Sequence, residues 1–289
     1  MSMSQPTRPA STVVLVRPAS EGVEVFLVRR HDNVAFMGGA HVFPGGRVDA
    51  SDYMSDLDIL DGDPDPRMRE RTGAEAVAFH VAAVRELFEE AGILLARSLD
   101  ADAGRGPIVS ITNGAVARFD DYRRALLDGS ITLRDLLERE RLRIALDALA
   151  LFAHWVTPVV ETRRFDTYFF LAVAPDSQDA AHDDRETTHG IWIRPEDAVR
   201  RALRGELALP PPTWTTLRAL SRVGTVEAAW RWAKAHHVAR VQPCFQQNAD
   251  GTRLVMLPGD PLCPGVEGFE AEEKRFLLEN GRWRPVTDR

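Results

Sequence analysis

Apolar and polar positions near the start of the chain predict a pair of strands. Residues 12–17 form a β-branched apolar run, which is typical of a buried strand, and residues 23–29 alternate between apolar and polar side chains. The polar residues and the glycine at 20–22 favour a turn between them, so the two runs predict a hairpin. Residues 1–10 are polar and contain two prolines, which predicts a disordered tail.

An apolar stripe with helical spacing follows in the next part of the chain. Its members recur every three or four residues, as Val77, Val81, Val84, Phe88 and Ala91. Gly92 suits the left-handed conformation in which many helices end, and Thr72 with Glu75 matches a capping box at the start. The pattern therefore predicts one amphipathic helix that starts at this box and ends at Gly92.

The remaining segments add both kinds of element. Residues 115–150 have a helical pattern in which Thr132 would cap the second helix, and Pro195 suits the first turn of a later helix. Strands are predicted at three places, 155–160, 167–173 and 191–193. The prolines at 210–212 would stop the chain before two further helices that run to about residue 237.

Two further segments show neither a helical nor a simple strand pattern. Residues 49–66 are rich in aspartate and predict an exposed insertion, and Asn280-Gly281 predicts a hairpin turn within residues 276–286. No internal repeat is present. Strands, one long helix, a helical insertion, strands and then helices indicate a mixed α+β fold.

Composition narrows the class of protein. The chain has 289 residues, of which 44% are hydrophobic and 27% charged, as is ordinary for a globular protein with a large core. The net charge of −7 argues against general affinity for nucleic acid. No segment reaches the roughly 20 apolar residues of a membrane span, and no secretory signal is visible.

Cysteine content bears on the compartment. Cys244 and Cys263 are the only two cysteines, too few for a disulfide framework, and each is predicted to be a small buried hydrophobe. A reducing cytosol is the simple interpretation, so we expect a cytoplasmic protein. Its partners are expected to be small molecules, neither nucleic acid nor membrane.

Three glutamates share one face of the predicted long helix. Glu86, Glu89 and Glu90 are spaced at i, i+3 and i+4, so their charges repel one another unless a cation lies between them. Magnesium prefers oxygen ligands and commonly bridges to substrate phosphates. Arg85 is placed to pair with Glu89 one turn later. A solvated, salt-bridged helix surface would show the same charges, so this segment alone leaves both interpretations open.

A glycine turn elsewhere in the chain favours the metal site over a salt-bridged helix surface. Phe43-Pro44-Gly45-Gly46, followed downstream by Arg-Glu-Leu-Phe-Glu-Glu-Ala-Gly-Ile at 85–93, resembles the signature box of the Nudix hydrolases. The interval between the two halves is longer than usual, and Val77 stands where that box commonly has a further glutamate. The acidic segment 49–66 accounts for much of the added length.

The residues before the box extend the resemblance. Arg30, Gly39 and the Phe-Pro-Gly-Gly turn have the spacing seen in Nudix coenzyme A diphosphatases, although His31 and Ala35 depart from it. Residues 40–49 and 163–167 are similar to the acyl-CoA diphosphatase branch. The resemblance implies a Nudix α/β/α sandwich, in which a mixed β-sheet lies between helices.

The same resemblance implies the domain plan. A Nudix domain would span residues 11–240, with insertions at about 49–70 and 101–150, and residues 241–289 would form a C-terminal extension of unknown role. The helices at 115–150 would lid the pocket or make a homodimer contact, and the sequence does not choose between these roles.

The activity that this resemblance implies is magnesium- or manganese-dependent hydrolysis of a diphosphate bond. Coenzyme A or acyl-CoA would yield 3′,5′-ADP and the corresponding 4′-phosphopantetheine. The metal ligands would be Glu86, Glu89, Glu90 and the carbonyl of Gly45, with Arg85 orienting the carboxylates. Glu89 also counts as a catalytic residue, and Glu186 is a candidate general base, for which an ordinary loop acid is the alternative.

The substrate contacts follow from the same comparison. Arg30, Arg163 and Arg164 are candidates for holding phosphates, since a guanidinium grips two oxygens at once, and Gly46 would lie against the substrate. Ordinary ion pairing is the alternative for each arginine. Trp155 would either stack on a base or belong to the core.

Other substrates and a different class of function stay open. ADP-ribose, NADH or a nucleoside-diphosphate sugar would suit the same chemistry, and Pro107 lies near where ADP-ribose-specific members carry a proline. A non-catalytic Nudix module that only binds a ligand is the third hypothesis. The intact glutamate trio disfavours it, because a binding module has little need of all three.

Overall fold

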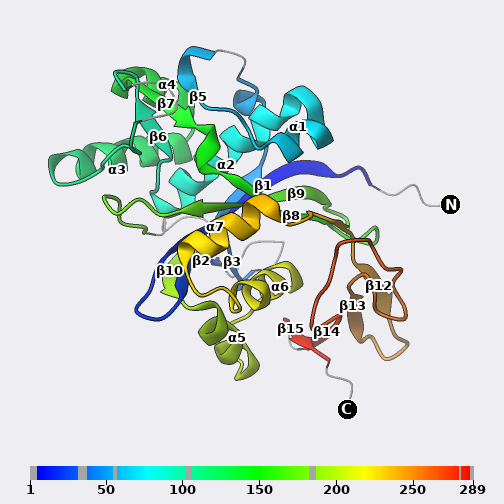
Figure 1. The fold of residues 1–289 in the computed structure, drawn as a ribbon. Helices are drawn as coiled ribbons and strands as arrows, with labels where there is room; N and C mark the ends of the chain where they lie inside the picture. Colours follow the sequence, from blue (N-terminus) through cyan, green and yellow to red (C-terminus); the bar gives the residue numbers. More distant parts are fainter. Residues whose placement is uncertain are drawn as a thin grey trace.

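A mixed β-sheet with helices on both faces forms the centre of the computed structural model (Figure 1). The structure describes residues 5–31, 38–54, 57–101, 106–181, 187–279 and 281–286. In the sheet the strand order is β10-β2-β1-β9-β8-β11, and β3 and β4 pair with β2 and β1 at one end. The bounds are β1 Arg8–Pro18, β2 Val23–Arg30, β3 His41–Val42, β4 Gly45–Arg47, β8 Ala150–Val156, β9 Phe165–Val173, β10 Thr187–Ile193 and β11 Arg240–Val241.

Helices cover both faces of this sheet. Helices α1 to α4 lie on one side with the small sheet β5-β7-β6, and α5 to α7 lie on the other (Figure 1). The helices are α1 Pro66–Thr72, α2 Ala76–Ala91, α3 Gly114–Leu127, α4 Leu133–Glu140, α5 Pro195–Leu203, α6 Pro211–Leu220 and α7 Val226–Ala235. The small sheet consists of β5 Leu60–Asp61, β6 Ala96–Ser98 and β7 Leu142–Ala145. This arrangement confirms the predicted α/β/α sandwich.

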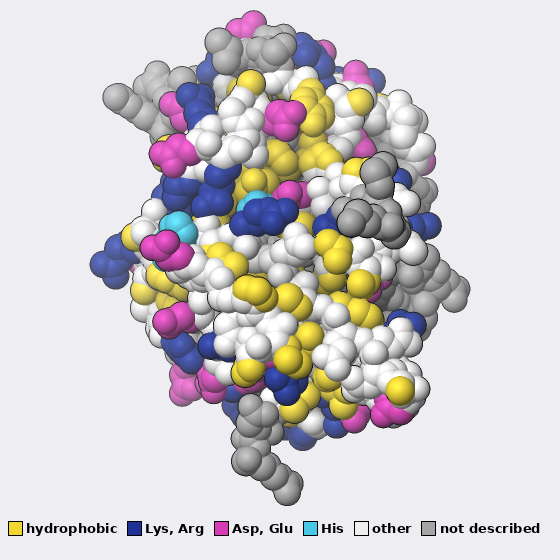
Figure 2. Space-filling model, turned by 90° about the vertical axis from the view of Figure 1, so that its right-hand side faces the viewer, with side chains coloured by type: hydrophobic (Ala, Val, Ile, Leu, Met, Phe, Trp, Pro, Cys, Tyr) yellow, Lys and Arg dark blue, Asp and Glu magenta, His cyan; other side chains and the backbone are white. Residues whose placement is uncertain are grey.

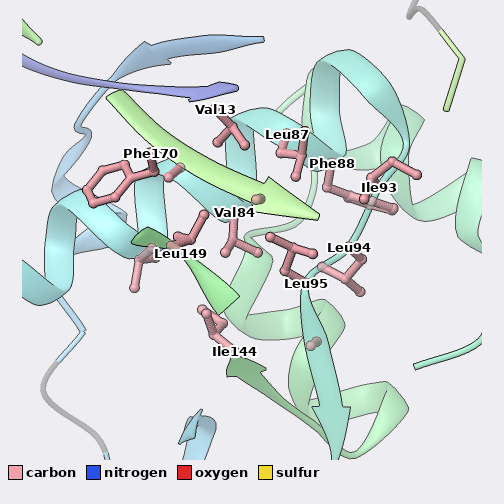
Figure 3. Packing of buried hydrophobic residues seen from close by; sticks show 14 of the residues in the cluster. Val13, Val84, Leu87, Phe88, Ile93, Leu94, Leu95, Ile144, Leu149 and Phe170 are labelled. Atoms are coloured by element: carbon pink, nitrogen blue, oxygen red, sulfur yellow. The ribbon is translucent and has the colours of Figure 1, made fainter. Parts of the chain in front are cut away.

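The alternation of side chains along β1 divides the core in two. Val13 and Leu15 pack toward α2, whereas Val14 and Val16 belong to the cluster on the opposite face. Figure 3 shows Val84, Leu87 and Phe88 of α2 within the first cluster. Because one face of α2 is fixed in this core, the orientation of its polar face is fixed as well.

Helix α2 ends as predicted but begins later. Gly92 adopts a left-handed conformation with φ of 72° and its N–H donates to the carbonyl of Phe88. At the other end, Thr72 belongs to α1, where its hydroxyl donates to the carbonyl of Met68. The predicted capping box with Glu75 is therefore wrong, because the hydroxyl is used one turn earlier.

Several other sequence predictions hold. The hairpin of β1 and β2 forms, Thr132 caps α4 in a capping box with Asp135, and Pro195 opens α5. Helices α6 and α7 fill the interval before residue 237, although the prolines at 210–212 begin α6 as well as ending the preceding segment. Strands β14 and β15 form the predicted hairpin around Gly281.

Three boundaries are wrong for non-local reasons. Residues 8–10 are not a tail, because they pair with the start of β9. The helical pattern of 115–150 ends at Glu140, and residues 142–145 form β7 between β5 and β6. Strand β8 spans 150–156, not 155–160, since a short apolar run does not distinguish strand from buried helix by its periodicity.

The acidic segment 49–66 is not an exposed insertion. Asp52, Asp61 and Asp65 are buried, and each carboxylate pairs with one arginine elsewhere in the chain or in the following turn. Met54 and Ile59 join the core beside α2. The segment is therefore part of the framework that surrounds α2, because paired charges can be buried.

The C-terminal extension forms a second sheet that packs on the main one. Its order is β12-β13-β14-β15, with bounds Cys244–Gln247, Arg253–Met256, Arg275–Glu279 and Arg282–Pro285. Val255 and Phe276 share a buried cluster with Trp214 of α6, and Trp155 of β8 meets Phe269 edge-on with ring centroids 6.0 Å apart. The extension thus shares a core with the main sheet.

Cys244 and Cys263 form a disulfide within this extension, with Cα atoms 5.6 Å apart. The prediction of two unpaired cysteines is wrong. Strand β12 and the turn before β14 come together only through the pairing of the second sheet, which two isolated cysteines in a sequence do not reveal. The expectation of a reducing cytosol rested on two unpaired cysteines, so the disulfide removes that argument.

Positive and negative side chains alternate on the face of the molecule that Figure 2 shows. On the face that Figure 2 shows, Lys and Arg side chains are interspersed with Asp and Glu side chains, so that face presents no continuous basic surface. Within the ranges that the structure describes, no helix is long and apolar enough to cross a membrane.

Candidate active site

The glycine turn and the glutamates of α2 meet in space. Strand β4 pairs with β1, which sets Gly45 beside Thr12 and brings the turn over the polar face of α2. The N–H of Gly45 donates to Oε2 of Glu90 over 2.9 Å. Two motifs that are far apart in the sequence therefore form one site, as the pattern predicted.

A side chain at either glycine of the turn would collide with its surroundings, with the backbone at Gly45 and with the carboxylate of Glu86 at Gly46. A Cβ added at Gly46 would lie 2.3 Å from Oε1 of Glu86, and one added at Gly45 would lie 2.4 Å from the carbonyl oxygen of Ser11. Real Cβ atoms do not approach other atoms so closely. The absence of side chains here lets the carboxylate of Glu86 lie directly against the backbone of the turn.

Arg85 connects the glutamates to the acidic segment before α1. Its Nε and Nη2 donate to the two carboxylate oxygens of Asp52, each over 2.9 Å. Its Nη1 donates to Glu86 over 2.8 Å and to Glu89 over 3.1 Å, and Nη2 also reaches the carbonyl of Arg47. Burial alone would lower the pKa of Arg85, but these carboxylates raise it, so the guanidinium stays charged.

Asp52 is the residue of this site that the sequence did not reveal. Its side chain is 1% exposed, and it holds Arg85 in the bidentate geometry that fixes a guanidinium most firmly. The acidic composition of its segment had indicated solvent exposure. Asp52 is recognisable as a site residue only from its pairing with Arg85, and that pairing becomes visible only in the fold.

The electrostatics of the cluster favour a cation. Burial, together with the charge of Glu89, raises the pKa of Glu86 to about 7, although Arg85 acts to lower it. Carboxylates so close together are stabilised in their charged form by an added positive charge. The donor set therefore suits a divalent ion.

A cavity of about 700 Å³ opens onto these carboxylates. The residues 45, 46, 85, 86, 89 and 90 all line it, together with Arg30 and Arg163. The Nε atom of Arg30 is buried and has no hydrogen-bond partner among the described residues, which suits an anionic ligand. This volume is typical of a small-molecule site.

The helical insertion closes one side of the cavity. Leu127 at the end of α3 and Ile131 before α4 line it, and Arg123 of α3 donates to the carbonyl of Glu89 over 2.8 Å. The insertion therefore forms a wall of the cavity beside the carboxylates. Trp155 belongs to the core, where it is 5% exposed, and it also lines the cavity, while its stacking on a base stays a prediction.

Comparison with known proteins identifies the family. The model of the NUDT19 Nudix domain matches residues 61–220, which is more than half of the chain. The chain belongs to the Nudix family. The predicted hydrolase class is confirmed, and the assignment of the fold as a Nudix sandwich is confirmed with it.

Relatives and solved structures agree with this assignment. The chain is 29% identical over 276 residues to the acyl-coenzyme A diphosphatase NUDT19 of Homo sapiens, covering 85% of this chain and 73% of the relative. It is 28% identical to the protein of the same name from Gallus gallus, covering 87% and 75%. A crystal structure of a Nudix hydrolase from Alicyclobacillus acidocaldarius superposes with a TM-score of 0.64 at 28% identity, covering 80% of this chain and 97% of that chain.

Nudix hydrolases generally use divalent metal ions. In the described part of this chain, no three acidic, histidine or cysteine side chains converge as a preformed cage. The oxygens of Glu86, Glu89 and Glu90 instead face Arg85 and the N–H of Gly45. Magnesium is commonly held by one or two carboxylates plus substrate phosphates, so the Nudix site fits an ion that is shared with the substrate.

One predicted Nudix site residue, Arg164, does not enter this geometry. Arg164 is 7% exposed, does not line the cavity, and donates to the carbonyls of Thr157 and Gln5. Its prediction as a phosphate ligand is not supported, because its guanidinium ties the end of β8 to the start of the chain. Glu186 lies outside the described residues.

Replacing Gly46 with alanine is expected to lower kcat by about tenfold or more while the protein stays folded. The added Cβ would lie 2.3 Å from Oε1 of Glu86 and would therefore displace this carboxylate. Steady-state rates with magnesium measure the effect. Gly224→Ala is the matched control, because a Cβ there meets nothing within 4 Å. Equal rates in both variants would mean that the position of Glu86 does not matter.

Proposed function

We propose that this protein hydrolyses the diphosphate bond of coenzyme A or acyl-CoA to 3′,5′-ADP and the corresponding 4′-phosphopantetheine, using Mg²⁺ or Mn²⁺. The observation that carries the proposal is the contact of Glu86 and Glu90 with the glycine turn at a large cavity. Relatives named acyl-coenzyme A diphosphatase, at 26% to 29% identity, favour this substrate over other nucleotides.

Arg85 and Gly45 position the three glutamates that we assign as metal ligands. Arg85 holds Glu86 and Glu89 in place, and the N–H of Gly45 holds Glu90, so the carboxylates are positioned before a ligand arrives. We assign these three glutamates and the carbonyl of Gly45 as metal ligands. A divalent ion bound there would offset the negative charge that gathers on the attacked phosphate and would lower the pKa of a water molecule.

The chain's own groups supply the remaining chemistry. Arg30 and Arg163 line the cavity and are assigned to the phosphate oxygens, with the backbone at Gly46 beside them. Glu89, which is 15% exposed, or Glu186 would accept the proton of the attacking water. The partly buried Glu89 is already within reach of the cavity.

A panel of substrates tests the proposal. Purified protein is incubated with magnesium and with coenzyme A, acyl-CoAs, ADP-ribose, NADH or nucleoside-diphosphate sugars, and the products are separated by chromatography. Release of 3′,5′-ADP from coenzyme A or its esters is expected. AMP from ADP-ribose alone would move the assignment to another Nudix substrate, and tight binding without turnover would indicate a non-catalytic module.

Three further assignments belong to this proposal. The Nudix domain is assigned to residues 11–240 and the extension to 241–289, although the two share a buried cluster. A cytoplasmic location and a homodimer are proposed from the sequence alone. Fractionation of the source cells and light scattering of the purified protein test these two assignments.

A further inference from the structure

Part of the lining of the cavity is apolar and has no role in the diphosphate chemistry. Six lining residues come from the start of α6 and from the C-terminal extension, and they are Pro210, Pro211, Pro212, Pro243, Val255 and Trp283. None carries a charge, and the prolines have no N–H to donate. A ligand in contact with this wall therefore meets few hydrogen-bonding groups.

Apolar surface continues from the reaction centre to this wall. Phe43, which precedes the glycine turn by one proline, belongs to the same buried cluster as Trp155 of β8 and Val255 of β13, and Trp283 packs against that cluster. All four of these residues also line the cavity. A molecule whose diphosphate lies at the glutamates can thus extend an apolar portion along one continuous surface.

We propose that this wall binds the acyl chain of an acyl-CoA, and that Trp283 is a residue that determines the preferred chain length. The inference rests on the function proposed above. An acyl chain needs no hydrogen bonds and gains free energy from burial of its methylene groups. An adenine base needs partners for its polar edges, and among the side chains of these six wall residues only the indole of Trp283 has a hydrogen-bonding group.

The extension would then be a substrate-binding element. Trp283 lies on β15, where it pairs with Leu278 of β14, and β14 in turn packs through Phe276 on Trp214 of the main core. The indole is partly buried and faces the cavity from a sheet that is anchored at several points. The position of the indole is therefore set by the packing of this sheet.

The chain-length dependence of kcat/KM tests this inference. Rates are measured for free coenzyme A, acetyl-CoA, octanoyl-CoA and dodecanoyl-CoA with the wild-type protein and with Trp283→Ala. We expect kcat/KM for dodecanoyl-CoA to fall about tenfold, and that for free coenzyme A to change less than about twofold. Trp283→Phe, which keeps an aromatic ring, is expected to retain most of the preference for long chains.

Trp230→Ala is the matched control. Trp230 of α7 packs against the same buried cluster but does not line the cavity, so its loss tests for general loosening of the core. An equal change for every substrate in Trp283→Ala, or the same profile in Trp230→Ala, would overturn the inference. Weaker inhibition by 3′,5′-ADP in Trp283→Ala would show that the indole contacts the nucleotide instead.

The outcome separates the two proposals. If the wild-type protein hydrolyses neither coenzyme A nor its esters, the proposed function fails. If it hydrolyses them and Trp283→Ala leaves the chain-length profile unchanged, only the assignment of the apolar wall fails.

Discussion

Glu90→Gln is expected to lower kcat by about a hundredfold or more without unfolding the protein, and Glu89→Gln is expected to behave alike. The amide keeps the size of the side chain and removes the charge that would hold a divalent ion. Glu90 is 4% exposed and Glu89 is 15% exposed, so solvent does not replace the missing charge. Steady-state kinetics with magnesium, together with circular dichroism, measure both parts of this expectation.

Glu75→Gln provides the control for this experiment. Glu75 is exposed just before the first residue of the same helix and does not line the cavity, so its variant should retain the wild-type rate. Wild-type rates in both Glu89→Gln and Glu90→Gln would refute their role as metal ligands. A loss of helical signal in either variant would instead point to a structural role.

Asp52→Asn is expected to lower the free energy of unfolding by about 2 kcal/mol, because the buried Arg85 loses its bidentate, charge-assisted pair with Asp52 and keeps its hydrogen bonds to Glu86 and Glu89. Asp52 and Arg85 are 1% and 9% exposed, and two hydrogen bonds of 2.9 Å join them. The rate should fall as well, since Arg85 would no longer be fixed beside Glu86 and Glu89. Urea unfolding at a constant m-value measures the stability.

Asp49→Asn is the control for the buried pair. Asp49 approaches Arg85 at 3.9 Å but its side chain is 49% exposed, so its loss should cost less than about 1 kcal/mol. Similar losses of stability in the two variants would mean that the Asp52 pair does not hold the site together.

The parts of the site that could be predicted from the sequence are those that depend on residues close together in the chain. The helical period of α2, the left-handed Gly92 and the spacing of Glu86, Glu89 and Glu90 all lie within one short segment. The meeting of that segment with the glycine turn followed from the family resemblance, and the hydrogen bond from Gly45 to Glu90 agrees with it.

Features that depend on distant pairing could not be predicted. Burial of Asp52 requires Arg85 from another element, the disulfide requires the pairing of β12 with β13, and β7 is a strand only because β5 and β6 flank it. Each is decided by what lies opposite in space, which composition and periodicity do not contain. Arg163 and Arg164 illustrate the same limit, since these neighbours face the cavity and the chain start respectively.

The apolar wall was missed for a similar reason. Pro243, Val255 and Trp283 carry no motif, and their approach to the glutamates results from the packing of the second sheet on α6 and β8. Sequence patterns described the extension as a hairpin with turns. Its contribution to the cavity became visible only with the fold.

Anomalous diffraction from crystals of the wild-type protein with Mn²⁺ and coenzyme A tests the central claim most directly. The account predicts a manganese peak bonded to carboxylate oxygens of at least two of Glu86, Glu89 and Glu90, beside the turn at Gly45 and Gly46. An active protein whose only manganese peak lies away from these carboxylates would contradict it.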